Sequence, residues 1–476
     1  MKKRVLAVGV VLALAFGVAG IASAALDFGV YRDKTLANLS QDQFGFKGPL
    51  ARSSSRQVTQ QQALDNPLSL FTLAKGLKAR VVSTDVAPIA DQISFWPNEQ
   101  NPKWIIVCNE TDDPTVAGLQ RVNIATGEAA TIVSGTEECD PTRLTPWGSI
   151  IFGEEDGQEG RTYELIDPLH TTGVHLDRDT GVFSGGVGAD NLVTRTTLGT
   201  MAFEGYGILP NGVTYADGDD SSLGPKNGGP GDSYFKFIPS TLWTPGDPPI
   251  TGLDQSPYAA GGTWYGLRVG GGSPFTGYGQ GREFGLAHWV QLAGGNNPNL
   301  EQQGLDAGLT GYYRPEDMQL DLGAVSRGFA RACSPDTGDE THHLYGQVVC
   351  FTDGSLSQAA NNTATPEIQP FEIGGTSRGI NMPDNIAFQP GSGSAVLHED
   401  AETTFEGPHD NDLWDCLPDG PDQDLLTDGC IRIGTLNDLT AEWTGGIFDA
   451  AGKHFYVSIQ HNISGRATIL DITGWK

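Results

Sequence analysis

Basic residues are scarce in this 476-residue chain, in which 29 Lys and Arg stand against 58 Asp and Glu. Three of the 29 are Lys2, Lys3 and Arg4, so the chain after residue 24 keeps 26 basic residues and a formal charge of −32. So negative a protein repels nucleic acid and anionic lipid, which argues against both as partners. The charge suits solubility, high salt, or the collection of divalent cations.

Long apolar runs are also rare. The one at the start, Val5 to Ile21, follows the three basic residues and precedes Ala22-Ser23-Ala24, a small-x-small cleavage pattern. It is shorter and richer in glycine than a membrane-spanning helix requires. We therefore expect a signal peptide over residues 1–24, export to the periplasm or the extracellular space, and no stable membrane insertion. An uncleaved anchor is the alternative.

Methionine and long helical patterns are scarce, whereas glycine (64) and proline (28) are abundant. This balance favours many strands and turns. Strand-like blocks recur on the order of 45–70 residues apart, which is typical of blades with long loops. We expect an all-β fold: an irregular N-terminal arm over residues 25–75, then a single β-propeller over 76–476 with long loops on one face.

Six cysteines in an exported protein indicate disulfides. Cys416 and Cys430 flank one polar loop, and Cys333 and Cys350 flank another, so each set is expected to pair. Cys108 and Cys139 remain. They either pair with each other or leave a thiol for other chemistry.

Short acidic steps stand where strand-like blocks begin or end. In a propeller the inner strands share one end of the axis, so acids from different blades would converge there. Calcium is coordinated by six to eight oxygen ligands, and iron accepts carboxylates and thiolate as ligands. A single acidic step is more often a turn, but the recurrence favours a metal site. The steps are Glu154-Glu155-Asp156, Phe203-Glu204-Gly205, Asp217-Gly218-Asp219-Asp220, Arg314-Pro315-Glu316-Asp317 and Pro383-Asp384-Asn385.

A set of ordered motifs resembles the PhoX-type alkaline phosphatase family. Cys139 followed by Thr145-Pro146-Trp147-Gly148 and Glu154-Glu155 is similar to that family's first signature. The steps at Glu204, Asp219-Asp220, Arg314-Pro315-Glu316 and Pro383-Asp384-Asn385 follow in the same order, and the chain closes on Glu442-Trp443-Thr444-Gly445-Gly446 and Val457-Ser458-Ile459-Gln460-His461.

The resemblance implies a six-bladed propeller that hydrolyses small phosphate esters with calcium and iron. It implies that Arg314 and Glu316 are catalytic, with Arg314 contacting phosphate. The metal ligands it implies are Cys139, Glu154, Glu155, Glu204, Glu316 and Asp384. A disulfide between Cys108 and Cys139 would remove the iron–thiolate site.

Two other interpretations stay open. One is a non-catalytic, calcium-stabilised exported propeller that binds a partner or builds a surface assembly; the other is a calcium-dependent esterase or lactonase. The spacer between Cys139 and Thr145 departs from the family pattern, and the block His398-Glu399-Asp400 does not align. His342, His343 and His461 are more often structural than metal ligands at such positions. The oligomeric state is left open.

Overall fold

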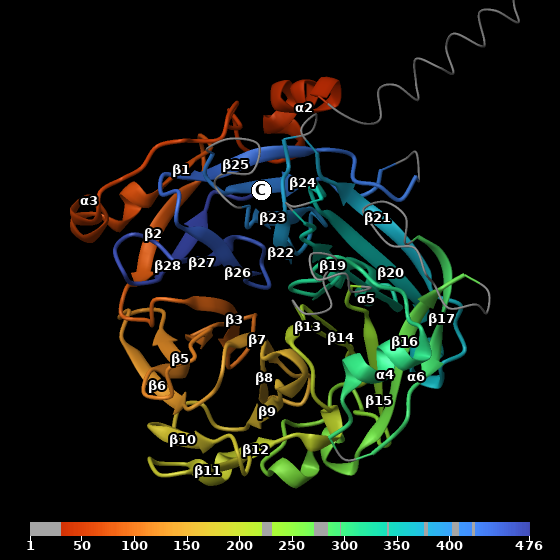
Figure 1. Ribbon diagram of the computed structural model, residues 1–476. Coiled ribbons are helices and arrows are strands. Elements are labelled where there is room, and N and C mark those ends of the chain that lie inside the picture. Colours follow the sequence, from red (N-terminus) through yellow and green to blue (C-terminus); the bar gives the residue numbers. More distant parts are fainter. Residues whose placement is uncertain are drawn as a thin grey trace, which may run out of the picture.

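The computed structural model describes residues 30–220, 231–270, 284–295, 297–339, 342–375, 379–401, 409–420 and 424–476. These residues form five sheets arranged around a common axis, so the all-β, propeller-like fold is confirmed (Figure 1). The signal peptide predicted over residues 1–24 lies outside the described residues. Within the described ranges, no helix is long and apolar enough to cross a membrane.

Two sheets follow the N-terminal arm. The first contains β3 (Ala90–Trp96), β4 (Trp104–Asn109), β5 (Ala117–Asn123), β6 (Ala129–Ser134), β10 (Val174–Asp177) and β11 (Val182–Ser184). The second contains β7 (Cys139–Leu144), β8 (Ile150–Glu154), β9 (Thr162–Leu165) and β12 (Leu192–Thr194). In each, the first four strands in sheet order from the axis are antiparallel neighbours.

The third sheet has nine strands, in the order β13 (Phe203–Ile208), β14 (Thr214–Gly218), β15 (Phe235–Pro239), β16 (Gly262–Val269), β17 (Gly285–Gln291), β21 (Glu367–Ile373), β20 (Gln347–Ser355), β19 (Phe329–Asp336) and β18 (Gln319–Leu320). Its two halves meet where β17 pairs with β21, Gly285 opposite Ile368. The expectation of separate blades fails at this seam, because two outer edges have joined into one sheet.

Strands from the two ends of the chain close the last two sheets. One contains β22 (Pro383–Phe388), β23 (Ala395–Glu399), β24 (Asp412–Cys416), β25 (Cys430–Leu436) and the early strand β1 (Phe71–Leu73). The other contains β26 (Glu442–Phe448), β27 (His454–Gln460), β28 (Thr468–Thr473) and β2 (Lys78–Ser83). Hydrogen bonds from β1 and β2 therefore hold the start of the fold to its end.

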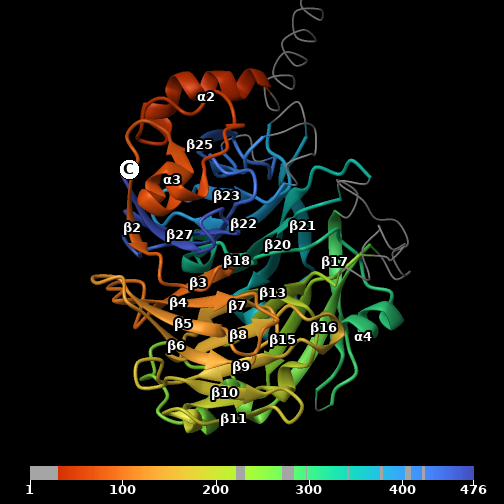
Figure 2. The same ribbon diagram turned by 60° about the vertical axis from the view of Figure 1, so that its left-hand side comes forward.

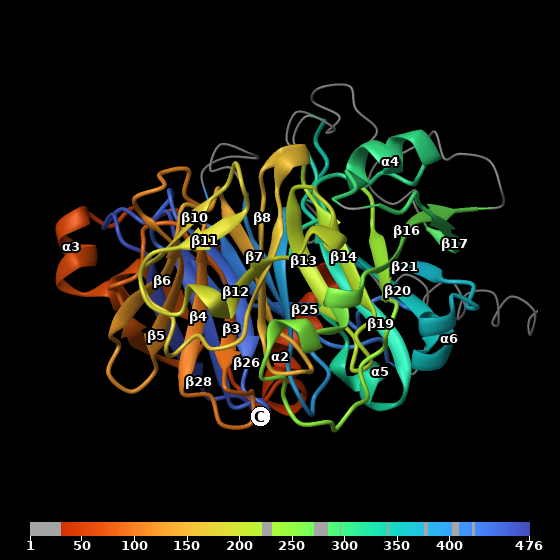
Figure 3. The same cartoon turned by 90° about the horizontal axis from the view of Figure 1, so that it is seen from below.

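The N-terminal arm is more regular than the sequence indicated. It contains α2 (Val30–Gln43), which contacts β25, and α3 (Gln60–Asp65), both visible beside the final sheets in Figure 2. Thr59 and Gln62 form a reciprocal capping box that begins α3. Figure 3 shows α4 (Leu300–Ala307) and α5 (Leu322–Ser326) at opposite edges of the molecule; α6 (Leu356–Asn361) follows β20.

Six edge strands face the axis. They contact one another in the closed order β3, β7, β13, β18, β22, β26 and back to β3. Apolar side chains pack between neighbouring sheets, such as Phe95 against Tyr456 with ring centroids 5.2 Å apart. This packing fixes the inner strands, and with them the side chains at their ends.

Three disulfides tie neighbouring strands. The predicted pairs Cys333–Cys350 and Cys416–Cys430 are confirmed. Of the two alternatives for the remaining cysteines, the structure has the Cys108–Cys139 disulfide. Three disulfides are typical of a protein from an oxidising compartment.

Candidate metal centre

Four of the inner strands begin with a β-bulge that contains an acidic residue. The ladder skips Asp91 in β3, Asp140 in β7, Glu204 in β13 and Asp384 in β22. A bulge frees a residue from strand pairing and re-aims its side chain. The four carboxyl groups consequently line one cavity on the axis.

A second set of acids in the cavity lining follows directly after the strands that neighbour the inner strands. Glu110 follows β4, Glu155 follows β8 and Asp400 follows β23. Each of these strands is antiparallel to the inner strand beside it, so its end lies where the inner strand begins. Antiparallel pairing thus delivers two acids from one sheet to one place.

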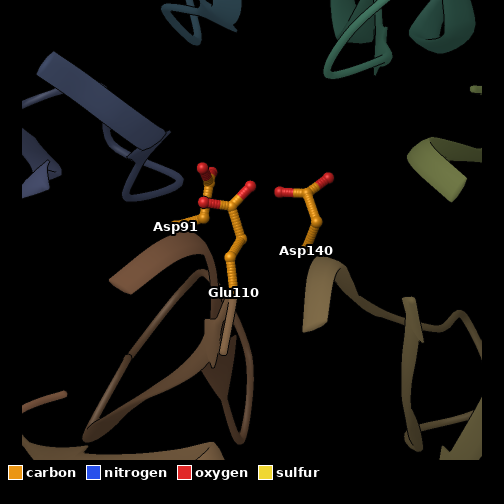
Figure 4. A group of neighbouring side chains, drawn as sticks. All are labelled: Asp91, Glu110 and Asp140. Carbon is orange, nitrogen blue, oxygen red and sulfur yellow. The ribbon is translucent and has the colours of Figure 1, made fainter. Parts of the chain in front are cut away.

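The resulting cavity has a volume of about 60 Å³. Ligand oxygens of Asp91, Glu110 and Asp140 lie within 4.8 Å of one another, and their carboxyl groups point to the same space in Figure 4. The full lining is Asp91, Glu110, Asp140, Glu155, Glu204, Arg314, Glu316, Asp384, Asn385, Asp400 and Glu442.

Few donors satisfy these carboxyl groups. Gln460 donates to Glu110, and Gln92 donates to Asp140 Oδ2 at 3.4 Å. Asp91 is only 6% exposed, yet no hydrogen-bond donor among the described residues reaches its Oδ1. A buried carboxylate oxygen without a donor is costly unless a proton or a cation lies beside it.

The acids strongly perturb one another. Burial, and then the neighbouring carboxylates, raise the pKa of Asp91, Asp140 and Glu204 well above the ordinary range. Burial also raises the pKa of Glu110 to about 7. Asp140 and Glu204 are in hydrogen-bond contact, carboxyl to carboxyl. Without a cation the cluster must therefore hold protons at neutral pH.

Among the described residues, Arg314 is the one cationic side chain in the lining. It pairs with Asp219 at 2.9 Å, Glu316 at 3.2 Å and Asp400 at 3.8 Å. Burial opposes its charge, but these acids hold the pKa of the guanidinium well above its usual value. Arg314 therefore stays charged and offsets part of the repulsion.

Backbone strain marks the same end of the axis. Glu138, Arg314 and Met382 have φ values of 43°, 56° and 47°, in the left-handed region. Each stands two residues before an acid of the cavity: Asp140, Glu316 and Asp384. Such conformations cost on the order of 1–3 kcal/mol each and concentrate at functional sites.

Five of the seven residues singled out from the sequence line this cavity: Glu155, Glu204, Arg314, Glu316 and Asp384. Two do not. The sulfur of Cys139 is bonded to Cys108 and is not available as a thiolate. The structure therefore gives no support to the predicted iron site.

Glu154 belongs to a different network. Its carboxylate accepts from the Glu137 N–H at 3.0 Å and pairs with Arg178 at 3.1 Å. Glu154 and Glu155 are consecutive and turn to different sides, because successive residues of a strand alternate in direction. Only Glu155 lines the cavity.

Sequence reasoning missed five acids of the lining: Asp91, Glu110, Asp140, Asp400 and Glu442. The signal that would have found most of them is positional. An acid stands at the first or second residue of an inner strand, or directly after the strand that follows it. No motif marks that position, because single acids are common in so acidic a chain.

Comparisons with known proteins give no family assignment. No family model matches the chain, and no curated protein matches it. The chain is similar to the PQQ-bound aldose sugar dehydrogenase of Streptomyces coelicolor, at 13% identity and a TM-score of 0.39, over 85% of this chain and 99% of that one. It is also similar to a glucose dehydrogenase-type oxidoreductase of Thermus thermophilus (10%, TM-score 0.42, 83% and 99%) and a gluconolactonase of Xanthomonas campestris (11%, TM-score 0.40, 89% and 96%).

These findings correct the family interpretation. No family model and no curated protein matches the chain, and the resemblance to PhoX-type alkaline phosphatases is wrong. The predictions that depended on this resemblance are therefore wrong as well. They are the hydrolysis of phosphate monoesters, the phosphate ester substrate and the phosphate contact of Arg314. The comparisons do not favour a surface-assembly protein instead.

Proposed function

We propose that this protein binds hard divalent cations, calcium foremost, in the carboxylate cavity on its axis. The observation that carries the proposal is the convergence of nine carboxyl groups and one guanidinium on about 60 Å³. A cavity needs roughly 10–15 Å³ of such space to hold one water molecule, so this one admits a cation together with coordinated water.

The donor chemistry favours calcium over softer metals. The acids and Asn385 of the lining offer oxygen donors, and calcium takes six to eight oxygens. Iron and zinc sites usually add imidazole or thiolate ligands. Asp91, Glu110 and Asp140 would supply the first ligands, because their oxygens are already close together.

The quinone cofactor of the Streptomyces enzyme does not fit this cavity. PQQ is a rigid tricyclic tricarboxylate, and about 60 Å³ lined by carboxylates excludes it by both size and charge. A wider cleft of about 630 Å³ lies farther along the same inner strands, lined by Phe95, Arg143 and Phe388 among others. The carboxylate set that would hold a metal is not part of its lining. The residues of this cavity therefore do not support oxidation by PQQ.

A second candidate function is the calcium-dependent ring opening of lactones. Arg314 favours it, because a guanidinium is not needed to hold a cation but stabilises an oxyanion. Its side chain is 33% exposed and reaches the cavity. Bound calcium would supply Lewis acidity to a carbonyl oxygen. Arg314 would donate hydrogen bonds to the oxygen on which charge develops.

Calcium content after dialysis tests the cation proposal. Wild-type protein should retain calcium, and Asp91→Asn/Asp140→Asn should lose at least one equivalent. The matched control is Asp415→Asn, because Asp415 is a buried carboxylate on β24 outside the cavity. Equal calcium in all three proteins would refute the proposal. For the second candidate, a lactone assay with and without chelator is decisive: no hydrolysis, or hydrolysis that chelator leaves unchanged, would exclude it. Hydrolysis that Arg314→Gln leaves intact would exclude the role of Arg314.

We also propose export, a two-part domain organisation and six blades. Residues 1–24 direct export, in line with the three disulfides. Residues 25–75 form an arm and 76–476 the propeller domain. The nine-stranded sheet corresponds to two blades joined at β17–β21, which gives six blades around the six inner strands.

A further inference from the structure

A second group of acids lies beside Arg314. It consists of Asp219, Asp220, Asp232 and Glu301, none of which lines the cavity. Asp219 and Asp220 follow β14, Asp232 bridges to Tyr312, and Glu301 is in the first turn of α4. All four are at most 8% exposed.

Three of these carboxyl groups are each held by a donor. Asp219 Oδ2 accepts from Arg314 Nε at 2.9 Å, and Glu301 Oε1 accepts from the Ala202 N–H at 2.8 Å. Asp232 accepts from the backbone N–H of Asp220. These bonds fix the orientation of each carboxyl group.

The other oxygen of each of the three groups is buried without a donor. No hydrogen-bond donor among the described residues reaches Asp219 Oδ1, Asp232 Oδ2 or Glu301 Oε2. The carboxyl groups of Asp220 and Glu301 are moreover in hydrogen-bond contact, although neither supplies a donor when ionised. A proton shared between the two carboxyl groups, or a cation bound to both, satisfies this contact.

We infer that Asp219, Asp232 and Glu301, with Asp220 beside them, form a second divalent-cation site of the calcium type. The pattern of one anchored and one open oxygen is what a carboxylate shows when a metal takes its second oxygen. Burial and the neighbouring acids also raise the pKa of Glu301, to about 8. The site joins the end of β14 to the start of α4, so cation binding would hold that helix to the sheet.

Arg314 contacts acids of both sites. Its Nε contacts Asp219 of the second site, and its Nη2 contacts Glu316 of the cavity. A guanidinium in contact with both sets of acids reduces the repulsion between them. The second site does not rest on the proposed function of the cavity, because the two share no acid.

Metal content with calcium alone as the probe tests the inference. Asp232→Asn/Glu301→Gln, in which both amides can still accept the anchoring hydrogen bonds, should contain one calcium fewer than wild type. Asp91→Asn/Asp140→Asn should keep that calcium and lose the cavity's instead. Asp415→Asn is the matched control and should keep both.

Each outcome decides one site. Unchanged calcium in Asp232→Asn/Glu301→Gln, with a loss in Asp91→Asn/Asp140→Asn, overturns only the second site. A loss of calcium in Asp232→Asn/Glu301→Gln, with unchanged calcium in Asp91→Asn/Asp140→Asn, supports the second site and overturns the cation site proposed in the cavity. Should the double variant not fold, Glu301→Gln alone gives the same readout through calcium affinity: a loss of about tenfold supports the site, and an unchanged affinity overturns it.

Discussion

Cys139 and Asp140 are consecutive residues of β7 with opposite surroundings. Cys139 is bonded to Cys108 and packs in an apolar cluster between the first two sheets. Asp140 lies in the bulge that follows and lines the cavity, with its ligand oxygen near those of Asp91 and Glu110. The disulfide therefore anchors the strand that presents the acid without contributing a metal ligand.

The first prediction concerns this disulfide. Cys108→Ser/Cys139→Ser should lower the free energy of unfolding by about 3–4 kcal/mol, because the bond closes a loop with a sequence separation of 31. Calcium content should stay at the wild-type value, since neither sulfur is a ligand. Chemical denaturation and metal analysis measure the two effects. Loss of metal from a folded variant would contradict the assignment.

The second prediction concerns the dependence of stability on calcium. A cation present at 100 times its Kd stabilises the folded state by about 2.7 kcal/mol. Chelation should accordingly lower the Tm of the wild-type protein. In Asp91→Asn/Asp140→Asn the difference in Tm between calcium and chelator should be smaller than in wild type, while Asp415→Asn should show the wild-type difference. A Tm that chelation leaves unchanged in wild type would contradict the prediction.

The third prediction concerns pH in the absence of calcium. Burial raises the pKa of Asp91 and Asp140 well above normal and that of Glu110 to about 7, so the folded state binds more protons than the unfolded state above pH 4. Stability must then fall as pH rises from about 4 to 7 and beyond. Saturating calcium should oppose this loss, because the metal replaces the protons. Denaturation at several pH values, with and without chelator, measures both slopes.

The opposite slope in chelator, with stability rising from pH 4 to 7, would mean that the cavity acids are not held protonated. Asp91→Asn provides the matched variant. It removes one carboxyl group whose pKa is raised, so the free energy of unfolding should depend less steeply on pH.

The fourth prediction concerns Arg314. Arg314→Gln removes the guanidinium that lines the cavity, so calcium affinity should rise by about tenfold, or 1.4 kcal/mol. Without calcium the variant should be less stable, because Glu316 and Asp219 lose their partner. Calorimetric titration measures the affinity. Arg178→Gln is the control, since Arg178 pairs with Glu154 outside the cavity; an affinity that rises equally in both variants would contradict a local effect.

Part of the site was accessible from sequence because acidic steps recur. Glu155, Glu204 and Asp384 stand in such steps, and the structure brings them together. Asp91 and Glu110 were missed, since an isolated acid beside a buried strand looks like a turn residue. Glu154 and Glu155 could not be told apart, because strand register decides which of two neighbours faces the axis.

Composition and local pattern determined the acidity, the strand-rich fold and the pairing of Cys333 with Cys350 and of Cys416 with Cys430. These depend on neighbours in the chain or on the chain as a whole. Tertiary structure decided the partner of Cys139, the seam between β17 and β21, and the set of acids that meets on the axis. The physical reason is that bulges and long-range strand pairing orient those side chains, and neither leaves a mark in the local sequence.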